Sequence, residues 1–266
     1  MPTPLNSQPS NLEILLRHSI DIDQLNVFMF NACHTKTGEM LMPLDDLPAV
    51  RVVRIGKSNA TQAQSIFFHA YRENIFLRYM LNAKRRGYEQ RLRGFIREQL
   101  MAHYSGSNLS LAIAIKDQLV GAVMVSRADD PRNFTSHWRW RLRMYSIAGI
   151  YYTEQLRDYY ERLHYALKQI DHYWISLIAL HPNHQHRGYG HALVEAVHRE
   201  CEQDNLFQGL SIDTSDTQSK AFFESLGYYK VADVPIRDFS MNVLFHPKVG
   251  SECPFMPAPE QCDSKG

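Results

Sequence analysis

The chain has 266 residues, of which 44% are hydrophobic, and its formal net charge is +1. A chain of this length can bury a sizeable core and fits one domain with appendages better than two full domains. Because the net charge is close to zero, there is no global attraction to nucleic acid or to anionic membranes, and neither is expected as a partner.

The cysteines and the N-terminal segment favour a cytoplasmic protein. The four cysteines are scattered and form no Cys-x-x-Cys pair: Cys33, Cys201, Cys253 and Cys262. The sequence therefore predicts neither a zinc ribbon nor a disulfide framework. The first apolar stretch is interrupted by charged residues and has no basic region before it, so neither a signal peptide nor a membrane anchor is expected.

Residues 1–47 are predicted to be an extension of the main domain. Ser10 and Glu13 have the spacing of a capping box, which predicts that a helix begins there. This helix is interpreted as packing on the domain surface, with a partner-binding arm as the alternative.

The main domain is predicted over residues 48–247, as an α/β fold with a mixed, mostly antiparallel central sheet flanked by helices. A β-branched run over residues 50–55 predicts the first strand, and Ser58 or Asn59 is placed to cap a helix that reaches Tyr71. A second helix carries an apolar face of Leu92, Phe95, Ile96 and Leu100. Its other face is basic, which is typical of a solvated helix surface or, less often, of a nucleic-acid patch.

A β-hairpin and a helical insertion are expected next. Apolar residues over 109–115 and 119–125 flank a turn at Asp117 and predict two antiparallel strands. The insertion spans about residues 127–173 and contains an apolar stripe at helical spacing: Tyr152, Leu156, Tyr159, Leu163, Leu167 and Ile170. This stripe is interpreted as core packing, whereas Trp138 and Trp140 fit an aromatic acceptor pocket, a nucleic-acid surface or the core.

The most informative stretch is a predicted strand, turn and helix over residues 174–201. Seven nearly continuous apolar residues from Trp174 suit a strand buried on both faces, and Pro182 ends it. The turn that follows contains Gln185 and a Gly-x-Gly sequence, and it leads into an amphipathic helix. The first amides of a helix have no partner within it and carry the positive end of its dipole, so this turn is a candidate anion site.

Two other phosphate-binding motifs are excluded. A dinucleotide-binding fingerprint needs a glycine at position 193, which is Leu193. The sequence Gly-Lys-Ser that begins at Gly56 resembles the end of a P-loop, but the glycine that this loop requires five residues earlier is Arg51.

After this helix the pattern predicts a buried strand that ends at Asp213, a helix closed by Gly227, and two final strands. The tail, residues 248–266, is rich in proline and polar residues and is predicted to be disordered.

Strand, proline, Gln-x-Arg-Gly-x-Gly and amphipathic helix together resemble the acetyl-CoA-binding core of the GNAT superfamily of N-acetyltransferases. The later sequence Ala-Phe-Phe-Glu-Ser-Leu-Gly-Tyr, from Ala221, resembles the helix-to-strand segment of the same family. Asp-Thr-Ser-Asp from Asp213, with the aromatic-rich region before Trp174, is most similar to the puromycin N-acetyltransferase-like branch.

The resemblance implies a GNAT fold, acetyl-CoA as co-substrate without a metal, and direct transfer of the acetyl group to a primary amine. It implies that backbone groups of Ile178 and Leu180 pair with the pantetheine arm and that amides of residues 187–191 hold the pyrophosphate. The implied cofactor-binding residues are Ile178, Ala179, Leu180, Gln185, His186, Arg187, Gly188, Tyr189, Gly190, His191 and Ser219. Helices before the hairpin are expected to border the acceptor site.

Two positions depart from the family pattern. Phe223 stands where the family usually has a tyrosine that acts as an acid, and Ser219 replaces an asparagine that contacts the cofactor. Because phenylalanine cannot donate a proton, a CoA-binding sensor without turnover is the alternative to an enzyme. The leaving thiol can depart as a thiolate with help from dipoles or water, which favours the enzyme.

Asp213 is the candidate general base, because the amine must lose a proton before it attacks the thioester. The alternative is that its side chain caps the following turn. A small-molecule amine is the favoured acceptor, with a protein N-terminus or lysine as the alternative, and the sequence leaves open whether the protein is a monomer or a homodimer.

The histidines around the turn raise the question of a metal. Only His184 and His186 are close enough in sequence to form a local pair, and no cysteine or carboxylate accompanies them. Imidazoles beside bound phosphates are the preferred interpretation, and no metal is expected.

Overall fold

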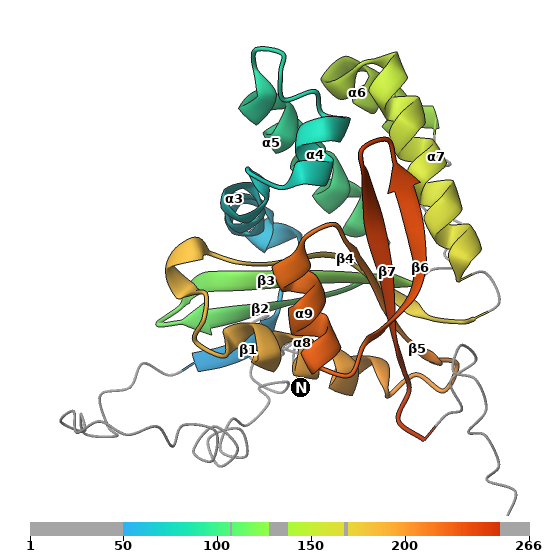
Figure 1. Cartoon of the computed structure of the whole chain (residues 1–266). Coiled ribbons are helices and arrows are strands. Elements are labelled where there is room, and N and C mark those ends of the chain that lie inside the picture. The colour runs from blue at the N-terminus through green and yellow to red at the C-terminus, as the bar shows by residue number, and fades with distance from the viewer. Residues whose placement is uncertain (1–49, 107, 128–137, 168–169, 251–266) are drawn as a thin grey trace, which may run out of the picture.

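The computed structural model describes residues 50–106, 108–127, 138–167 and 170–250. Its strands are β1 (Val50–Arg54), β2 (Leu109–Ile115), β3 (Gln118–Arg127), β4 (Tyr173–Leu180), β5 (Gly209–Thr214), β6 (Tyr229–Ile236) and β7 (Phe239–Pro247). They form one seven-stranded sheet in the order β1-β2-β3-β4-β5-β7-β6 (Figure 1). All neighbouring strands are antiparallel except β4 and β5, so the predicted mixed, mostly antiparallel sheet is confirmed.

Helices cover both faces of this sheet. They are η2 (Lys57–Asn59), α3 (Ala60–Tyr71), α4 (Ile75–Met80), α5 (Tyr88–His103), α6 (Trp138–Ala148), α7 (Ile150–Ala166), η4 (Pro182–His184), α8 (Tyr189–Cys201) and α9 (Thr217–Ser225). Asn59 is the N-cap residue of α3, although its side chain makes no capping bond to α3. The short helix α4 was not predicted; its N-cap residue is Asn74, whose side chain accepts a hydrogen bond from the Leu77 amide at 3.0 Å.

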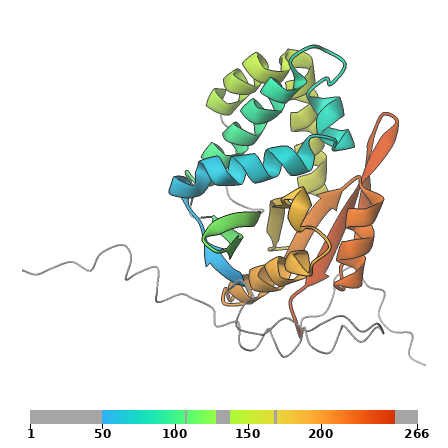
Figure 2. The ribbon, with the colours of Figure 1, turned by 90° about the vertical axis from the view of Figure 1, so that its left-hand side faces the viewer.

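Two hydrophobic cores lie on opposite faces of the sheet. Helices α3 to α7 pack on one face, around Phe67, Ile96 and Met124. Helices α8 and α9 pack on the other, around Val197 and Phe223. In the turned view α3 to α7 lie above the sheet and α8 lies below it (Figure 2).

The helical insertion contributes to the first core. Leu156, Tyr159 and Leu163 of α7 are buried there, which confirms the core interpretation of this stripe. Trp140 is also buried, whereas 65% of the surface of Trp138 is exposed, so the alternating aromatic and basic segment does not form one surface.

Strand β4 contains a β-bulge. Val125 pairs with Ile175 and Met124 with Leu177, so Ser176 is an extra residue without a partner position on β3. Ile175 therefore belongs to the α8 core, whereas Leu177 belongs to the opposite core. β4 contributes to both cores, but it is not buried on both faces along its whole length as predicted. Its half-buried residues Trp174, Ser176, Ile178 and Leu180 line the cavity described below.

Some predictions concern segments that the structure does not describe. The helix expected from Ser10, the start of the insertion and most of the C-terminal tail lie outside the described residues. Within the described ranges, no helix combines the length and the apolar character that crossing a bilayer requires.

The buried His103 predicts acid sensitivity of the fold. Burial lowers the pKa of His103 to about 4, partly offset by a hydrogen bond to the Leu109 carbonyl. The unfolded chain binds this proton below about pH 6.5, so the stability due to neutral His103 is complete above that pH and is lost as the pH falls towards 4. The loss should reach about 3 kcal/mol. In urea titrations at several pH values, His103→Gln should remove this part of the pH dependence, and the exposed control His164→Gln should not.

Candidate functional site

The site begins where the parallel strands separate. β4 and β5 pair only at Tyr173 with Leu210 and at Trp174 with Ser211, although both strands continue past these residues. Both strands line a cavity of about 1320 Å³ beyond the last pair. This cavity also receives residues from α3, α4, α5, α7, α8 and α9, so elements far apart in the sequence share one site.

One end of the cavity is formed by the turn before α8. His186 and Gly188 have positive φ angles of 60° and 79°, and Gly188 is the N-cap residue of α8. A Cβ atom at Gly190 would lie 3.3 Å from the Phe222 ring, so only glycine leaves this gap fully open. The first amides of α8 thus lie beside open space, which fits an anionic ligand.

The structure brings most of the predicted cofactor-binding residues together. The cavity is lined by Ile178, Ala179, Leu180, Gln185, His186, Gly188, Gly190, His191 and Ser219. Arg187 is exposed and does not line the cavity, and the side chain of Tyr189 packs against the α8 core. The Gln185 side chain donates to the Leu180 carbonyl at 3.3 Å, so that oxygen already has a partner.

Tyr71 occupies the free edge of β4. Its hydroxyl donates to the Ile178 carbonyl at 2.9 Å and accepts from the Ile178 amide at 3.1 Å, as a neighbouring strand would do. Burial raises the pKa of Tyr71 to about 12, so this hydroxyl keeps its proton at neutral pH. Of the backbone groups that the resemblance assigns to pantetheine, those of Ile178 are therefore bonded to Tyr71 in this structure.

Asp213 lies at the end of β5 and is held by two donors. The Tyr159 hydroxyl donates to one of its oxygens, and the Trp174 indole nitrogen donates to the other at 2.8 Å. The following turn has its own cap, since Asp216 accepts from the Ser219 amide at 2.7 Å. Thus the proposed capping role belongs to Asp216 and not to Asp213.

The surroundings of Asp213 suit a proton acceptor. Burial raises the pKa of the Asp213 carboxyl above its usual range, and the bonds from Tyr159 and Trp174 oppose that rise. Among the described residues that line the cavity there is no lysine or arginine. The half-buried carboxylate can therefore take up a proton or bind an ammonium group without competition from a protein cation.

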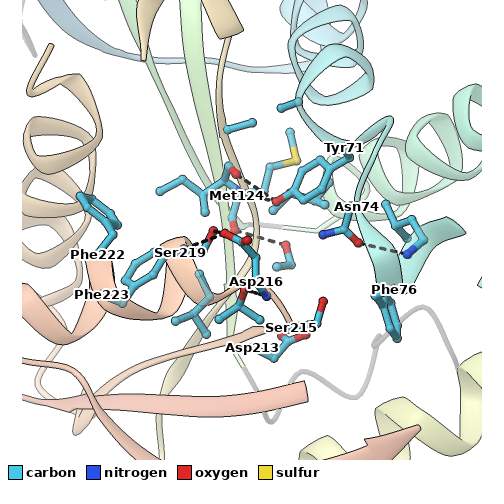
Figure 3. A pocket seen from close by; sticks show the side chains of 18 of the residues that line it. Tyr71, Asn74, Phe76, Met124, Asp213, Ser215, Asp216, Ser219, Phe222 and Phe223 are labelled. Atoms are coloured by element: carbon cyan, nitrogen blue, oxygen red, sulfur yellow. Dashed lines mark hydrogen bonds between the residues drawn. The ribbon is translucent and has the colours of Figure 1, made fainter. Parts of the chain in front are cut away.

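The position of the missing tyrosine is on the α9 side of the cavity. Phe223 is buried against Phe222 and Tyr228 and presents no polar atom. The hydroxyl of Ser215 is buried and bonds to none of the described residues. Figure 3 shows Phe222 and Phe223 across the cavity from Tyr71, with Asp213 and Ser215 at the lower side of the view.

The histidines of the turn do not form a metal centre in the described part of the chain. The rings of His181 and His184 are 6.1 Å apart, and His181 is also 5.5 Å from His69. No group of three or more potential ligands was found among the described residues.

A family model for acetyltransferases, described as the acetyltransferase (GNAT) family, matches residues 73–228, which is more than half of the chain. The chain belongs to the GNAT family. The match includes the separating strands, the α8 turn and the segment around Phe223, so it covers most of the site. No match was found among curated proteins.

Solved structures show the same fold at low sequence identity. A Corynebacterium glutamicum protein described as histone acetyltransferase HPA2 and related acetyltransferase has 14% identity and a TM-score of 0.54, over 78% of this chain and 98% of that one. An agmatine N-acetyltransferase has 13% identity and a TM-score of 0.55, over 74% and 99%. A Drosophila melanogaster polyamine N-acetyltransferase has 14% identity and a TM-score of 0.53, over 74% and 98%.

Sequence reasoning missed the residues that hold the site in place. Tyr71, Tyr159 and Trp174 were assigned to helices and a strand but not to the site. A buried tyrosine or tryptophan needs a partner for its polar atom, and this was the available signal. It does not identify the partner, because Tyr159 and Asp213 are 54 positions apart.

Proposed function

We propose that this GNAT protein transfers the acetyl group of acetyl-CoA directly to a primary amine in a ternary complex. The observation that carries the proposal is Asp213, a half-buried carboxylate that lines the same cavity as the α8 turn. The part of this cavity lined by α3, α4, α5 and α7 is called the chamber below. The turn would hold the pyrophosphate through backbone amides, and the amine would approach from the chamber.

The chemistry assigned to this chain is a proton transfer followed by acyl transfer. Asp213 takes a proton from the ammonium group, and the free amine attacks the thioester carbon. A new C–N bond forms, the C–S bond breaks, and CoA leaves as a thiolate, while the nitrogen gives up its second proton to that thiolate or to water to leave a neutral amide. Tyr159 and Trp174 orient the carboxylate through their hydrogen bonds.

The favoured acceptor is a small-molecule amine. The fold relatives named for agmatine and polyamines support this choice, since the same fold accepts small amines in those proteins. The resemblance around Asp213 to the puromycin-like branch supports an antibiotic-like amine. A protein N-terminus or lysine is the alternative acceptor.

We also propose the division into an extension over 1–47, the acetyltransferase domain over 48–247 and a tail.

Release of free thiol from acetyl-CoA tests the proposal. Purified protein with a panel of amines, polyamines and peptides should release thiol and form an acetylated amine detected by mass. Turnover of peptides alone would select the alternative acceptor.

The burial of Phe223 at the tyrosine position favours a second candidate, a CoA-binding sensor. Acetyl-CoA binding without turnover of any acceptor would support that candidate.

Tyr71 provides a test of the pantetheine assignment. If pantetheine uses the Ile178 amide and carbonyl, it must displace the Tyr71 hydroxyl, and Tyr71→Phe removes this competitor. A hydrogen bond has a net value of about 1 kcal/mol, so the Kd for acetyl-CoA should fall about fivefold. Calorimetric titration measures this.

A matched control is Tyr88→Phe, which removes a hydroxyl bonded to the Arg72 carbonyl outside the cavity lining. It should leave the affinity unchanged. Unchanged or weaker binding by Tyr71→Phe would show that acetyl-CoA does not use these groups of Ile178.

A further inference from the structure

The chamber beside Asp213 has an aromatic wall. The wall consists of Tyr71 from α3, Phe76 from α4, Tyr160 from α7 and Trp174 from β4, and the fully buried Tyr159 of α7 supports it. Ring centroids of Phe76 and Tyr159 are 4.7 Å apart, and those of Tyr160 and Trp174 are 5.7 Å apart, so the rings support one another. Tyr71 and Phe76 face the chamber from the side opposite α9 (Figure 3).

The polar atoms of this wall already have protein partners. Tyr71 bonds to Ile178, and Tyr159 and Trp174 bond to Asp213. The Tyr160 hydroxyl accepts from the Gln99 side chain at 3.2 Å. A ligand that lies against this wall therefore meets mainly the carbon surfaces of the rings, which favour a flat apolar group.

The charges in the chamber are also limited. Three carboxylates line the described part of the cavity: Glu73, Asp213 and Asp216. Glu73 is exposed and forms an ion pair with Arg78 at 2.8 Å, and Asp216 caps α9 on the cofactor side. Asp213 is thus the carboxylate available to an ammonium group at the aromatic wall.

We infer that the acceptor is an arylalkylamine, with one ammonium group at Asp213 and an aromatic body against the wall. This inference rests on the proposed function and specifies its substrate class. A polyamine would place its second cation among rings without a second carboxylate. The attraction of an ammonium to a tyrosine or phenylalanine face is smaller than the cost of desolvating that ammonium, so polyamines should be poor acceptors.

Matched amines test the inference with the full-length protein. We expect kcat/KM for 2-phenylethylamine to exceed that for 1,4-diaminobutane at least tenfold, because the phenyl group buries apolar surface and the second ammonium does not. An equal or higher value for the diamine would overturn the inference and leave the proposed acetyltransferase function intact.

Replacement of Gln99 by the isosteric but charged glutamate tests whether the aromatic wall sets the preference between the two amines. Gln99 is 7% exposed, and Gln99→Glu adds a carboxylate at the wall to which the Tyr160 hydroxyl can donate. This variant should raise kcat/KM for 1,4-diaminobutane relative to 2-phenylethylamine at least tenfold. Gln64→Glu, the same change at a residue that bonds to the Arg93 carbonyl outside the cavity lining, should not. An unchanged ratio in folded Gln99→Glu would show that the acceptor lies elsewhere.

Measurements of amine binding distinguish a failure of this inference from a failure of the proposed function. Failure of every amine to react would count against the proposed function. In that case, calorimetric titration of both amines into protein saturated with CoA decides the inference. Tighter binding of 2-phenylethylamine would support it, and tighter binding of the diamine or no binding of either amine would overturn it.

Discussion

Asp213→Asn should lower kcat/KM for amine acetylation by about a hundredfold or more, which is the range of general base catalysis. Asparagine has nearly the same shape and can still accept from Trp174, so folding should be preserved. The neutral side chain can neither take up the ammonium proton nor pair with the ammonium charge, and neither role involves the cofactor. The Kd for acetyl-CoA should therefore stay at its wild-type value.

The pH profile adds a second readout for Asp213. Its pKa is raised by burial, so the wild-type rate should fall on the acid side at a higher pH than for an ordinary aspartate, because the protonated carboxyl cannot act as a base. In Asp213→Asn the inflection due to this carboxyl should disappear, and the residual rate should follow the free-amine fraction of the substrate. The exposed control Asp233→Asn should match wild type, and wild-type kcat/KM in Asp213→Asn across the pH range would remove Asp213 from the mechanism.

Gly190→Trp should weaken acetyl-CoA binding by at least about a hundredfold. A Cβ atom at this position already approaches Phe222 at 3.3 Å, and the indole must occupy space at the first turn of α8. This separates the pyrophosphate from the helix amides, and losing even one charge-assisted hydrogen bond costs about 1.5–3 kcal/mol. Calorimetry with acetyl-CoA measures the effect.

The control for this prediction is Gly56→Trp, since a Cβ at Gly56 meets no atom within 4 Å and Gly56 does not line the cavity. Both proteins should unfold cooperatively, as thermal melting can verify. If folded Gly190→Trp bound acetyl-CoA like wild type, the pyrophosphate would have to bind elsewhere. Gly190→Trp should thus impair acetyl-CoA binding, and Asp213→Asn should impair the rate without a change in acetyl-CoA binding.

Local patterns predicted the sheet and most helices because apolar periodicity and turn residues act over short distances. The hairpin around Asp117 and the α8 turn follow directly from such signals. The helix α4 was missed because six residues are too few to show a helical period, although Asn74 caps it well.

Only the part of the site that consists of consecutive residues could be predicted from the sequence. The α8 turn carries its chemistry in consecutive backbone groups, so the sequence indicated it directly. The environment of Asp213 depends on Tyr159 and Trp174, which come from an insertion and a neighbouring strand. Their contacts arise from tertiary packing, and no spacing in the sequence encodes them. The hydrogen bonds of Tyr71 to the backbone of Ile178, the groups assigned to pantetheine, could not be predicted for the same reason.

The bulge at Ser176 constrains how this gene can vary. Before Ser176 the odd-numbered residue Ile175 belongs to the α8 core, and after it Leu177 and Ala179 belong to the opposite core. Loss of the Ser176 codon would remove the bulge and leave Ile175 and Leu177 on their present sides of a regular strand. Insertion of one codon after Leu177 would instead exchange the two sides for every later residue of the strand, which would turn Ile178 away from its own core. Substitutions in β4 are therefore local changes, whereas a one-residue insertion after the bulge changes both cores and the floor of the cavity at once.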